Sequence, residues 1–134
     1  MTHEVFIVSG ARTPIGSFMG NLSSFSAPEL AAAAIQKTMD TSSIEADQID
    51  EVLIGNVVSA GLKQAPARQA MRLAGIPDGC GATTINKVCG SGMKATMLAF
   101  DLIRSGSAET VFSGGMESMS NAPYLLANAR SGLR

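Results

Sequence analysis

The feature that most constrains the fold is an abrupt change of pattern at Cys89, where a strand-like run meets a helix-like run. Residues 82–88 have the composition of a short strand and are rich in β-branched side chains. Residues 92–105 have the pattern of a long apolar helix. Gly90 and Gly92 allow the backbone to bend sharply between the two runs. The pattern therefore predicts a strand-to-helix turn that carries a cysteine.

The predicted position of Cys89 also indicates a chemical role. A thiol at this place lies over the unpaired backbone N–H groups of the first helical turn. Those donors and the helix dipole favour thiolate over thiol, which makes a cysteine a better nucleophile at neutral pH. The common alternative is that a cysteine is a small buried hydrophobe. The residues alone leave both interpretations open.

The rest of the chain alternates between strand-like and helix-like segments, and this order predicts an α/β layered domain. Ser26 is expected to cap the first helix, because Glu29 follows three residues later as in a capping box. The helix that follows Cys89 carries few charges and is apolar over much of its circumference, so we expect it to be buried between layers. The other expected elements are strands at residues 5–8, 49–58 and 110–112, and helices at residues 26–39 and 66–73.

Composition excludes several classes of function. The 134 residues are 46% hydrophobic and 16% charged, with a net charge of -1, which suits a buried core or an oligomer rather than a disordered chain. No basic run indicates binding to nucleic acid or to an anionic membrane. Cys80 and Cys89 are too few for a disulfide framework or a zinc cluster. Without a signal-like start or a membrane-length apolar run, we expect a cytoplasmic protein with no metal site.

Four segments of the sequence resemble conserved stretches of one enzyme family. The run INKVCGSGMKA at residues 85–95 resembles the nucleophile motif of the thiolases, and in particular of the acetyl-CoA C-acetyltransferases. Three further stretches resemble thiolases in the family's order: SGARTPIG at residues 9–16, GNVVSAG at residues 55–61 and SGGMESMS at residues 113–120.

The resemblance implies a fold and a division into domains. Thiolases have an α-β-α-β-α architecture built from two similar halves, with a loop domain inserted in the first half. Residues 1–117 are therefore expected to form a thiolase-like N-terminal half-domain with a mixed sheet that lacks its last strand. Residues 118–134 are expected to begin the loop domain.

The resemblance also implies an activity and a role for Cys89. The full protein is expected to form acetoacetyl-CoA reversibly from two molecules of acetyl-CoA, with Cys89 as the acyl-carrying nucleophile and its backbone N–H as one oxyanion donor. Coenzyme A thioesters are then the substrates, and no separate cofactor is expected. The expected partners are further copies of the chain, in a dimer or tetramer. The form CGSGMKA resembles short-chain biosynthetic members, whereas degradative members tend to carry Cys-Ser-Ser-Gly at this place.

Two catalytic groups of the family belong to its C-terminal half and are not in this sequence, namely a second cysteine and an activating histidine. The single histidine, His3, is interpreted as incidental. Cys80 is interpreted as structural or exposed because no cationic partner is evident, and Arg68 as part of a structural pair. Two alternatives stay open: a catalytically inert fragment that retains only the dimerisation core, and a 3-ketoacyl-CoA thiolase of broader chain length.

Overall fold

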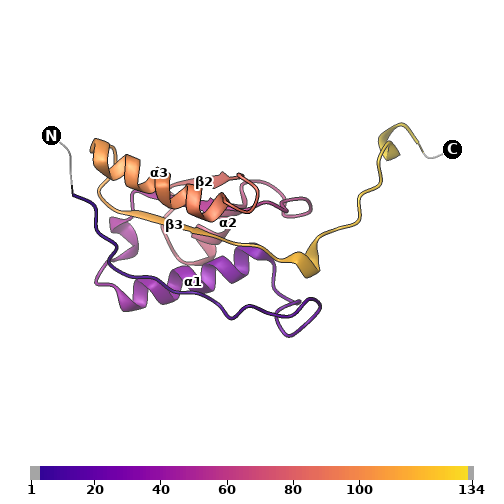
Figure 1. The fold of residues 1–134 in the computed structure, drawn as a ribbon, viewed down its shortest axis with the longest axis horizontal. Coiled ribbons are helices and arrows are strands. Elements are labelled where there is room, and N and C mark those ends of the chain that lie inside the picture. The colour runs from indigo at the N-terminus through magenta and orange to yellow at the C-terminus, as the bar shows by residue number, and fades with distance from the viewer. Residues whose placement is uncertain (1–3, 133–134) are drawn as a thin grey trace.

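Helices and strands alternate along the chain in the computed structural model, which describes residues 4–132 (Figure 1). The elements are α1 (Ala27–Thr41), β1 (Glu51–Gly55), α2 (Pro66–Leu73), β2 (Gly81–Ile85), α3 (Ser91–Ser105) and β3 (Val111–Gly115). Single turns of 3-10 helix lie at Ala46–Gln48, Met119–Asn121 and Ala129–Ser131. The predicted α/β class is confirmed.

The strands form one parallel sheet in the order β2-β1-β3. The central strand β1 is level with both neighbours, so that Leu53 pairs with Thr83 on one side and with Ser113 on the other. Val52, Leu53 and Ile54 are all buried, as expected for a parallel strand that is covered on both faces. Because the strands are parallel and in step, their carboxyl ends meet at one edge of the sheet.

Helices cover both faces of this sheet. Ile35 of α1 and Met71 of α2 share a buried core with Ile54. Helix α3 covers the opposite face, where Ala95 packs near Leu53, and Figure 1 shows α1 and α3 on opposite sides of the sheet. Successive side chains of a strand point to opposite faces, which explains why neighbouring residues of β1 belong to different cores.

Most element boundaries follow the signals in the sequence. Ser26 and Glu29 form the predicted capping box at the start of α1. The Glu29 carboxylate accepts hydrogen bonds from the Ser26 N–H at 2.8 Å and from the Ser26 hydroxyl at 2.7 Å. Helix α2 matches the predicted range, and α3 is followed by Gly106 in the left-handed conformation with a φ of 73°. Strand β2 ends at Ile85, before the predicted end at residue 88, because the chain already turns after Asn86.

The predicted strand at residues 5–8 is not formed within the described part of the chain. Phe6, Ile7 and Val8 are 72%, 89% and 67% exposed. A groove of about 490 Å³ separates this run from β3, so the run has no neighbouring strand with which to form a ladder. The expected mixed sheet is also corrected, because the strands described between residues 4 and 132 pair only in parallel.

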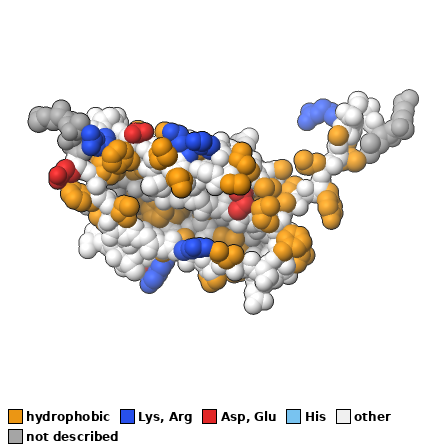
Figure 2. All heavy atoms as spheres, viewed as in Figure 1, with side chains coloured by type: hydrophobic (Ala, Val, Ile, Leu, Met, Phe, Trp, Pro, Cys, Tyr) orange, Lys and Arg blue, Asp and Glu red, His pale blue; other side chains and the backbone are white. Residues whose placement is uncertain are grey.

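Helix α3 is buried on one side only, which corrects the expectation of a helix enclosed between layers. Ala95 and Ala99 face the sheet, whereas Met93, Met97 and Phe100 are exposed. Among the described residues the sheet is the one layer that covers α3, so the side of α3 that faces away from the sheet is open to solvent. Figure 2 shows hydrophobic side chains gathered on the surface over this helix. None of the described helices, α3 included, is long and apolar enough to span a membrane.

Candidate active site

Cys89 lies in the turn between the end of β2 and the start of α3, as the sequence predicts. Its side chain is exposed, whereas Ser91 is buried beneath the same turn. The Ser91 hydroxyl accepts a hydrogen bond from the Lys87 N–H at 2.7 Å and donates one to the Val88 carbonyl at 2.6 Å. The Gly90 N–H donates to the Lys87 carbonyl at 3.1 Å. A buried serine thus holds the turn, and the cysteine lies on its outer side.

Val88, directly before the cysteine, has a strained backbone. Its φ is +49°, in the left-handed region that β-branched residues rarely adopt. Such a conformation costs on the order of 1–3 kcal/mol and persists only where the surroundings impose it. The Val88 N–H donates to Oδ1 of Asn86 at 3.0 Å, and its carbonyl accepts the Ser91 hydroxyl. These bonds hold the bend that places Cys89 directly before the first turn of α3.

Three glycines bring β1, β3 and α3 into backbone contact beside this turn. A Cβ at Gly55 would lie 2.4 Å from the carbonyl carbon of Ser91 and 2.5 Å from the nitrogen of Gly92. A Cβ at Gly115 would lie 3.3 Å from the Cα of Gly92. No side chain fits at Gly55 without a shift of the backbone, and the fit at Gly115 is already tight. The glycines therefore let the start of α3 rest directly on the carboxyl ends of β1 and β3.

A pocket of about 460 Å³ opens beside Cys89 at this edge of the sheet. Its walls come from the ends of β1 and β3 and from the turn before α3, so three of the four motif segments meet here. Apolar side chains dominate the lining, as in most small-molecule pockets, and include Val57, Val58, Met116 and Met119. The apolar wall suits a short hydrocarbon group better than a charged one.

Sequence reasoning assigns no role to Glu117, yet its carboxylate organises one wall of the pocket. It accepts hydrogen bonds from Nδ2 of Asn56 and the N–H of Val58, both at 2.8 Å, and from the N–H of Val57 at 3.1 Å. Asn56 is 1% exposed, and its Nδ2 also donates to the Met116 carbonyl at 3.3 Å. The sequence does place Glu117 shortly after β3 and Asn56 directly after β1. The parallel register of the two strands brings these residues together.

Cys80 has a different environment from Cys89. It is 7% exposed and lies in the turn that leads into β2. Burial raises the pKa of its thiol, and the Glu51 and Asp50 carboxylates add to this effect against the opposite influence of Arg68. Its Sγ contacts the Gly81 carbonyl at 3.3 Å. A buried thiol with a raised pKa is chemically inert, so the structure supports the structural interpretation of Cys80.

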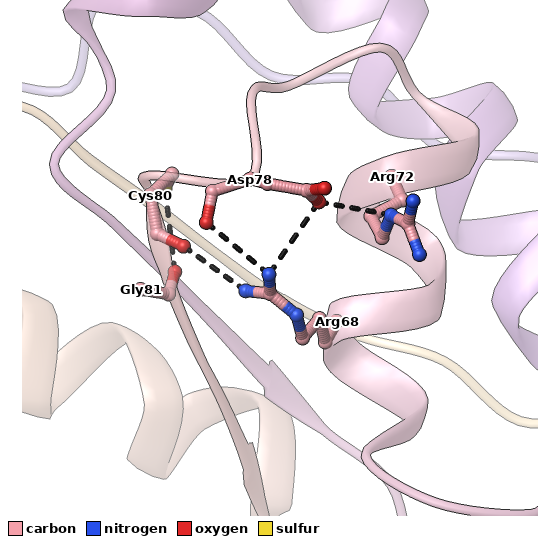
Figure 3. Close-up of polar contacts among 5 residues, drawn as sticks. All are labelled: Arg68, Arg72, Asp78, Cys80 and Gly81. Atoms are coloured by element: carbon pink, nitrogen blue, oxygen red, sulfur yellow. Dashed lines mark hydrogen bonds and ion pairs between the residues drawn. The ribbon is translucent and has the colours of Figure 1, made fainter.

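Arg68 ties this turn to α2, as Figure 3 shows. Its guanidinium donates to the Cys80 carbonyl at 3.4 Å and to the Asp78 carbonyl at 3.2 Å. The Asp78 carboxylate also forms ion pairs with Arg68 at 3.4 Å and with Arg72 at 2.9 Å. The structural pairing predicted for Arg68 is confirmed. The expectation that no cation lies near Cys80 is wrong, because α2 brings the arginine to the turn.

No activating base for Cys89 is found among the described residues. Apart from Cys89, Glu117 is the one ionisable residue of the described pocket lining, and its oxygens face N–H donors of residues 56–58. His3 lies outside the described residues. Between residues 4 and 132 there is also no cluster of three His, Cys, Asp or Glu side chains that could hold a metal ion. The site thus offers an exposed thiol, a helix start and an apolar pocket.

Comparison with known proteins identifies the family. A family model described as "Thiolase, N-terminal domain" matches residues 5–134, and the chain belongs to the thiolase family. Acetyl-CoA acetyltransferases from Pseudomonas aeruginosa and Escherichia coli are each 50% identical to it, over 131 and 129 residues. These matches cover 98% and 96% of the chain but 33% of each relative. The chain therefore spans about a third of the length of the curated relatives that it matches.

Solved structures of thiolases share the fold. An acetyl-CoA acetyltransferase from Bacillus anthracis matches with a TM-score of 0.95 at 38% identity, over 99% of this chain and 34% of that one. The Acat5 thiolase from Ascaris suum, solved in complex with coenzyme A, matches with a TM-score of 0.90 at 41% identity, over 92% and 32%. The resemblance to thiolases that the sequence motifs indicate is confirmed.

Proposed function

We propose that this chain supplies the acyl-accepting cysteine of an acetyl-CoA C-acetyltransferase, which forms acetoacetyl-CoA reversibly from two molecules of acetyl-CoA. The observation that carries the proposal is the exposed thiol of Cys89, placed on a strained turn at the start of α3 and beside an apolar pocket. The similarity to acetyl-CoA acetyltransferases and to a thiolase solved with coenzyme A supports the substrate class.

In the proposed first step, the Cys89 sulfur attacks the carbonyl carbon of acetyl-CoA. A carbon–sulfur bond forms to Cys89, the bond to the coenzyme A sulfur breaks, and coenzyme A leaves as a thiolate that takes up a proton. The product is again a thioester, so the step is reversible. The negative charge on the carbonyl oxygen requires N–H donors, and we assign the backbone N–H of Cys89 as one of them. Val57, Val58 and Met116 would surround the methyl group.

Intact mass spectrometry after incubation with acetyl-CoA tests this first step. We expect a single acetyl adduct on the wild-type chain, loss of the adduct in Cys89→Ala, and its retention in the matched control Cys80→Ala. An adduct that persists in Cys89→Ala would contradict the assignment. A wild-type chain that takes up no acetyl group would support the alternative of an inert fragment.

We further propose that the chain alone does not complete the condensation. The second half-reaction needs a base that removes the α-proton of the second acetyl-CoA. In this sequence the other cysteine is the buried Cys80, and the single histidine is His3. We therefore expect no thiolysis of acetoacetyl-CoA by the purified chain, followed by the loss of its absorbance. Measurable turnover by the chain would overturn this proposal.

We also propose that residues 1–117 belong to the N-terminal domain and that residues 118–134 begin a loop domain. In support, residues 122–128 are exposed, and Figure 1 shows this stretch leading away from the sheet and its helices. The turn Met119–Asn121 still contacts the body, because Nδ2 of Asn121 donates to the Phe25 carbonyl at 2.9 Å. Limited proteolysis tests this division, and we expect the first cut to fall within the exposed stretch at residues 122–128.

A further inference from the structure

We propose that Glu117 is a positioning residue, whose carboxylate holds residues 56–58 in place as one wall of the pocket beside Cys89. The proposal rests on the function proposed above, since the wall acts on the reaction only where Cys89 accepts an acyl group. Glu117, Val57, Val58 and Cys89 all line this pocket. Glu117 would act through the backbone of the wall rather than by touching the reacting atoms.

The contacts of the carboxylate carry the proposal. Its Oε1 accepts hydrogen bonds from Nδ2 of Asn56 and from the N–H of Val58, both at 2.8 Å, and its Oε2 accepts the Val57 N–H at 3.1 Å. Two successive backbone N–H groups thus converge on one anionic group, an arrangement found in anion-binding backbone turns. Hydrogen bonds to a charged acceptor are stronger than neutral ones, so the course of residues 56–58 depends on Glu117.

The buried amide of Asn56 gives an independent sign of this dependence. Its Nδ2 donates to Glu117 and to the Met116 carbonyl, while its Oδ1 has no hydrogen-bond partner among the described residues. Turning the amide over would place an oxygen against the carboxylate and the carbonyl, so these two acceptors fix the orientation that leaves Oδ1 unpaired. Unpaired buried polar atoms are rare in proteins. Because Glu117 needs N–H donors, the amide of Asn56 keeps the orientation that leaves its Oδ1 unpaired.

The same contacts argue against Glu117 as the base that activates Cys89. Each of its oxygens already accepts at least one N–H donor of residues 56–58, so the carboxylate is directed at the wall. A glutamine at this position has nearly the same shape, but one of its two terminal atoms is an NH₂ group that faces N–H donors. The substitution Glu117→Gln therefore removes the negative charge and one of the two acceptor atoms that hold the wall, with little change in volume.

The test compares Glu117→Gln with wild type and with Glu109→Gln. Glu109 is exposed just before β3, and its side chain forms no hydrogen bond or ion pair among the described residues, so it is a matched control. Amide hydrogen exchange is followed by NMR at Val57 and Val58. In parallel, the rate of Cys89 acetylation by acetyl-CoA is divided by the rate of its alkylation by iodoacetamide, a small reagent that does not need the pocket wall.

In Glu117→Gln we expect exchange at Val57 and Val58 to accelerate about tenfold, the effect of losing a hydrogen bond to a charged group. We expect the ratio of acetylation to alkylation to fall by at least about tenfold as well. The Asn56 N–H, which donates to the Ile85 carbonyl at 2.9 Å, should keep its protection, and Glu109→Gln should match wild type throughout. Glu117→Asp keeps the charge on a shorter side chain, so its exchange rates and its ratio of acetylation to alkylation should lie between those of wild type and Glu117→Gln. The aspartate variant also provides the test if Glu117→Gln does not fold.

The proposal is overturned if Glu117→Gln retains wild-type exchange at Val57 and Val58. It is also overturned if acetylation and alkylation slow by the same factor, because that result describes a general loss of structure. If wild type takes up no acetyl group at all, the proposed function fails instead. The exchange rates at Val57 and Val58 then still decide whether Glu117 holds the wall.

Discussion

At the scale of single residues, the two cysteines are expected to react very differently. Cys89 is exposed, whereas Cys80 is buried and its pKa is raised by that burial, so it forms less of the reactive thiolate. We expect iodoacetamide to modify Cys89 alone in the folded chain and both cysteines in urea. Peptide mapping by mass spectrometry measures this. Modification of Cys80 at a similar rate under native conditions would contradict the buried position assigned to it.

Gly55 is the residue at which an added methyl group should harm the fold most directly. In Gly55→Ala the new Cβ would lie against the backbone of Ser91 and Gly92, which cannot move aside as a flexible side chain can. Overpacking of this kind costs about 1–3 kcal/mol or more. We expect a loss of at least about 2 kcal/mol in the free energy of unfolding, measured in urea.

The matched control for Gly55→Ala is Gly79→Ala, because a Cβ at Gly79 meets no atom within 4 Å. This control should change the stability little or raise it slightly, since alanine restricts the unfolded chain more than glycine does. Equal unfolding curves for the two variants would show that the start of α3 does not rest on Gly55.

The turn at Cys89 could be predicted because its signals are local: a β-branched run, closely spaced glycines and a helical pattern follow one another directly. The role of Glu117 could not, because its partners at residues 56–58 lie about sixty positions earlier in the chain. Only the parallel register of β1 with β3 brings the ends of these strands together. The strain at Val88 is equally hidden, since no sequence rule assigns a left-handed conformation to a valine.

At the scale of elements, Asp50 links the start of β1 to the start of β3. Its carboxylate accepts hydrogen bonds from the N–H groups of Thr110 at 2.9 Å and Glu109 at 2.7 Å. These bonds, that from Thr110 foremost, lower the pKa of the Asp50 carboxyl below its ordinary value of 3.8. A group with a lowered folded-state pKa stabilises the fold above its unfolded-state pKa, and the contribution is lost as the pH falls through the folded-state value.

We therefore expect the urea midpoint of the wild-type chain to fall between about pH 5 and about pH 2 by more than that of Asp50→Asn, which cannot titrate at this position. The matched control is Asp101→Asn on the exposed side of α3, whose side chain forms no hydrogen bond or ion pair among the described residues. It should follow the pH dependence of wild type. If Asp50→Asn has the same pH dependence as wild type, the hydrogen bonds of Asp50 do not join the two strands in solution.

Elements whose signals are all local could be predicted from the sequence, and elements that depend on a neighbour in space could not. Helix α2 begins at a proline and ends at the predicted residue, because its limits are encoded by its own sequence. Residues 5–8 have the apolar pattern of a strand but form no ladder. A strand needs a partner strand beside it, and a groove lies between this run and β3. The exposed far side of α3 has the same origin, because an all-round apolar helix indicates covering layers without showing whether they are present.

At the scale of the whole molecule, much apolar surface is open to solvent. Exposed side chains lie on residues 6–8, on the far side of α3 and on residues 124–126, and Figure 2 shows several such groups on one face. The outer edge of β2 also carries unpaired backbone groups, because β1 is its one neighbour in the described sheet. Surfaces of this kind favour association with other protein surfaces.

We expect the purified chain to self-associate, with a mass by light scattering that rises with concentration above that of a monomer. The substitution Met97→Lys places a charge on the exposed side of α3 and should weaken the association where that side takes part. The control is Ala33→Lys, which adds the same single positive charge at an exposed position of α1. A clean monomer at high concentration would contradict the prediction of a homo-oligomer.

The close contact of Gly55, Gly92 and Gly115 limits how this site can be transplanted or redesigned. A loop that carried residues 86–93 alone into another parallel sheet would meet side chains at the receiving strand ends. The nucleophile segment must therefore travel together with the two strand ends that it touches, as a unit of three separate stretches. An engineer who exchanges thiolase segments should take all three stretches from one parent, with no crossover point between the first stretch and the last.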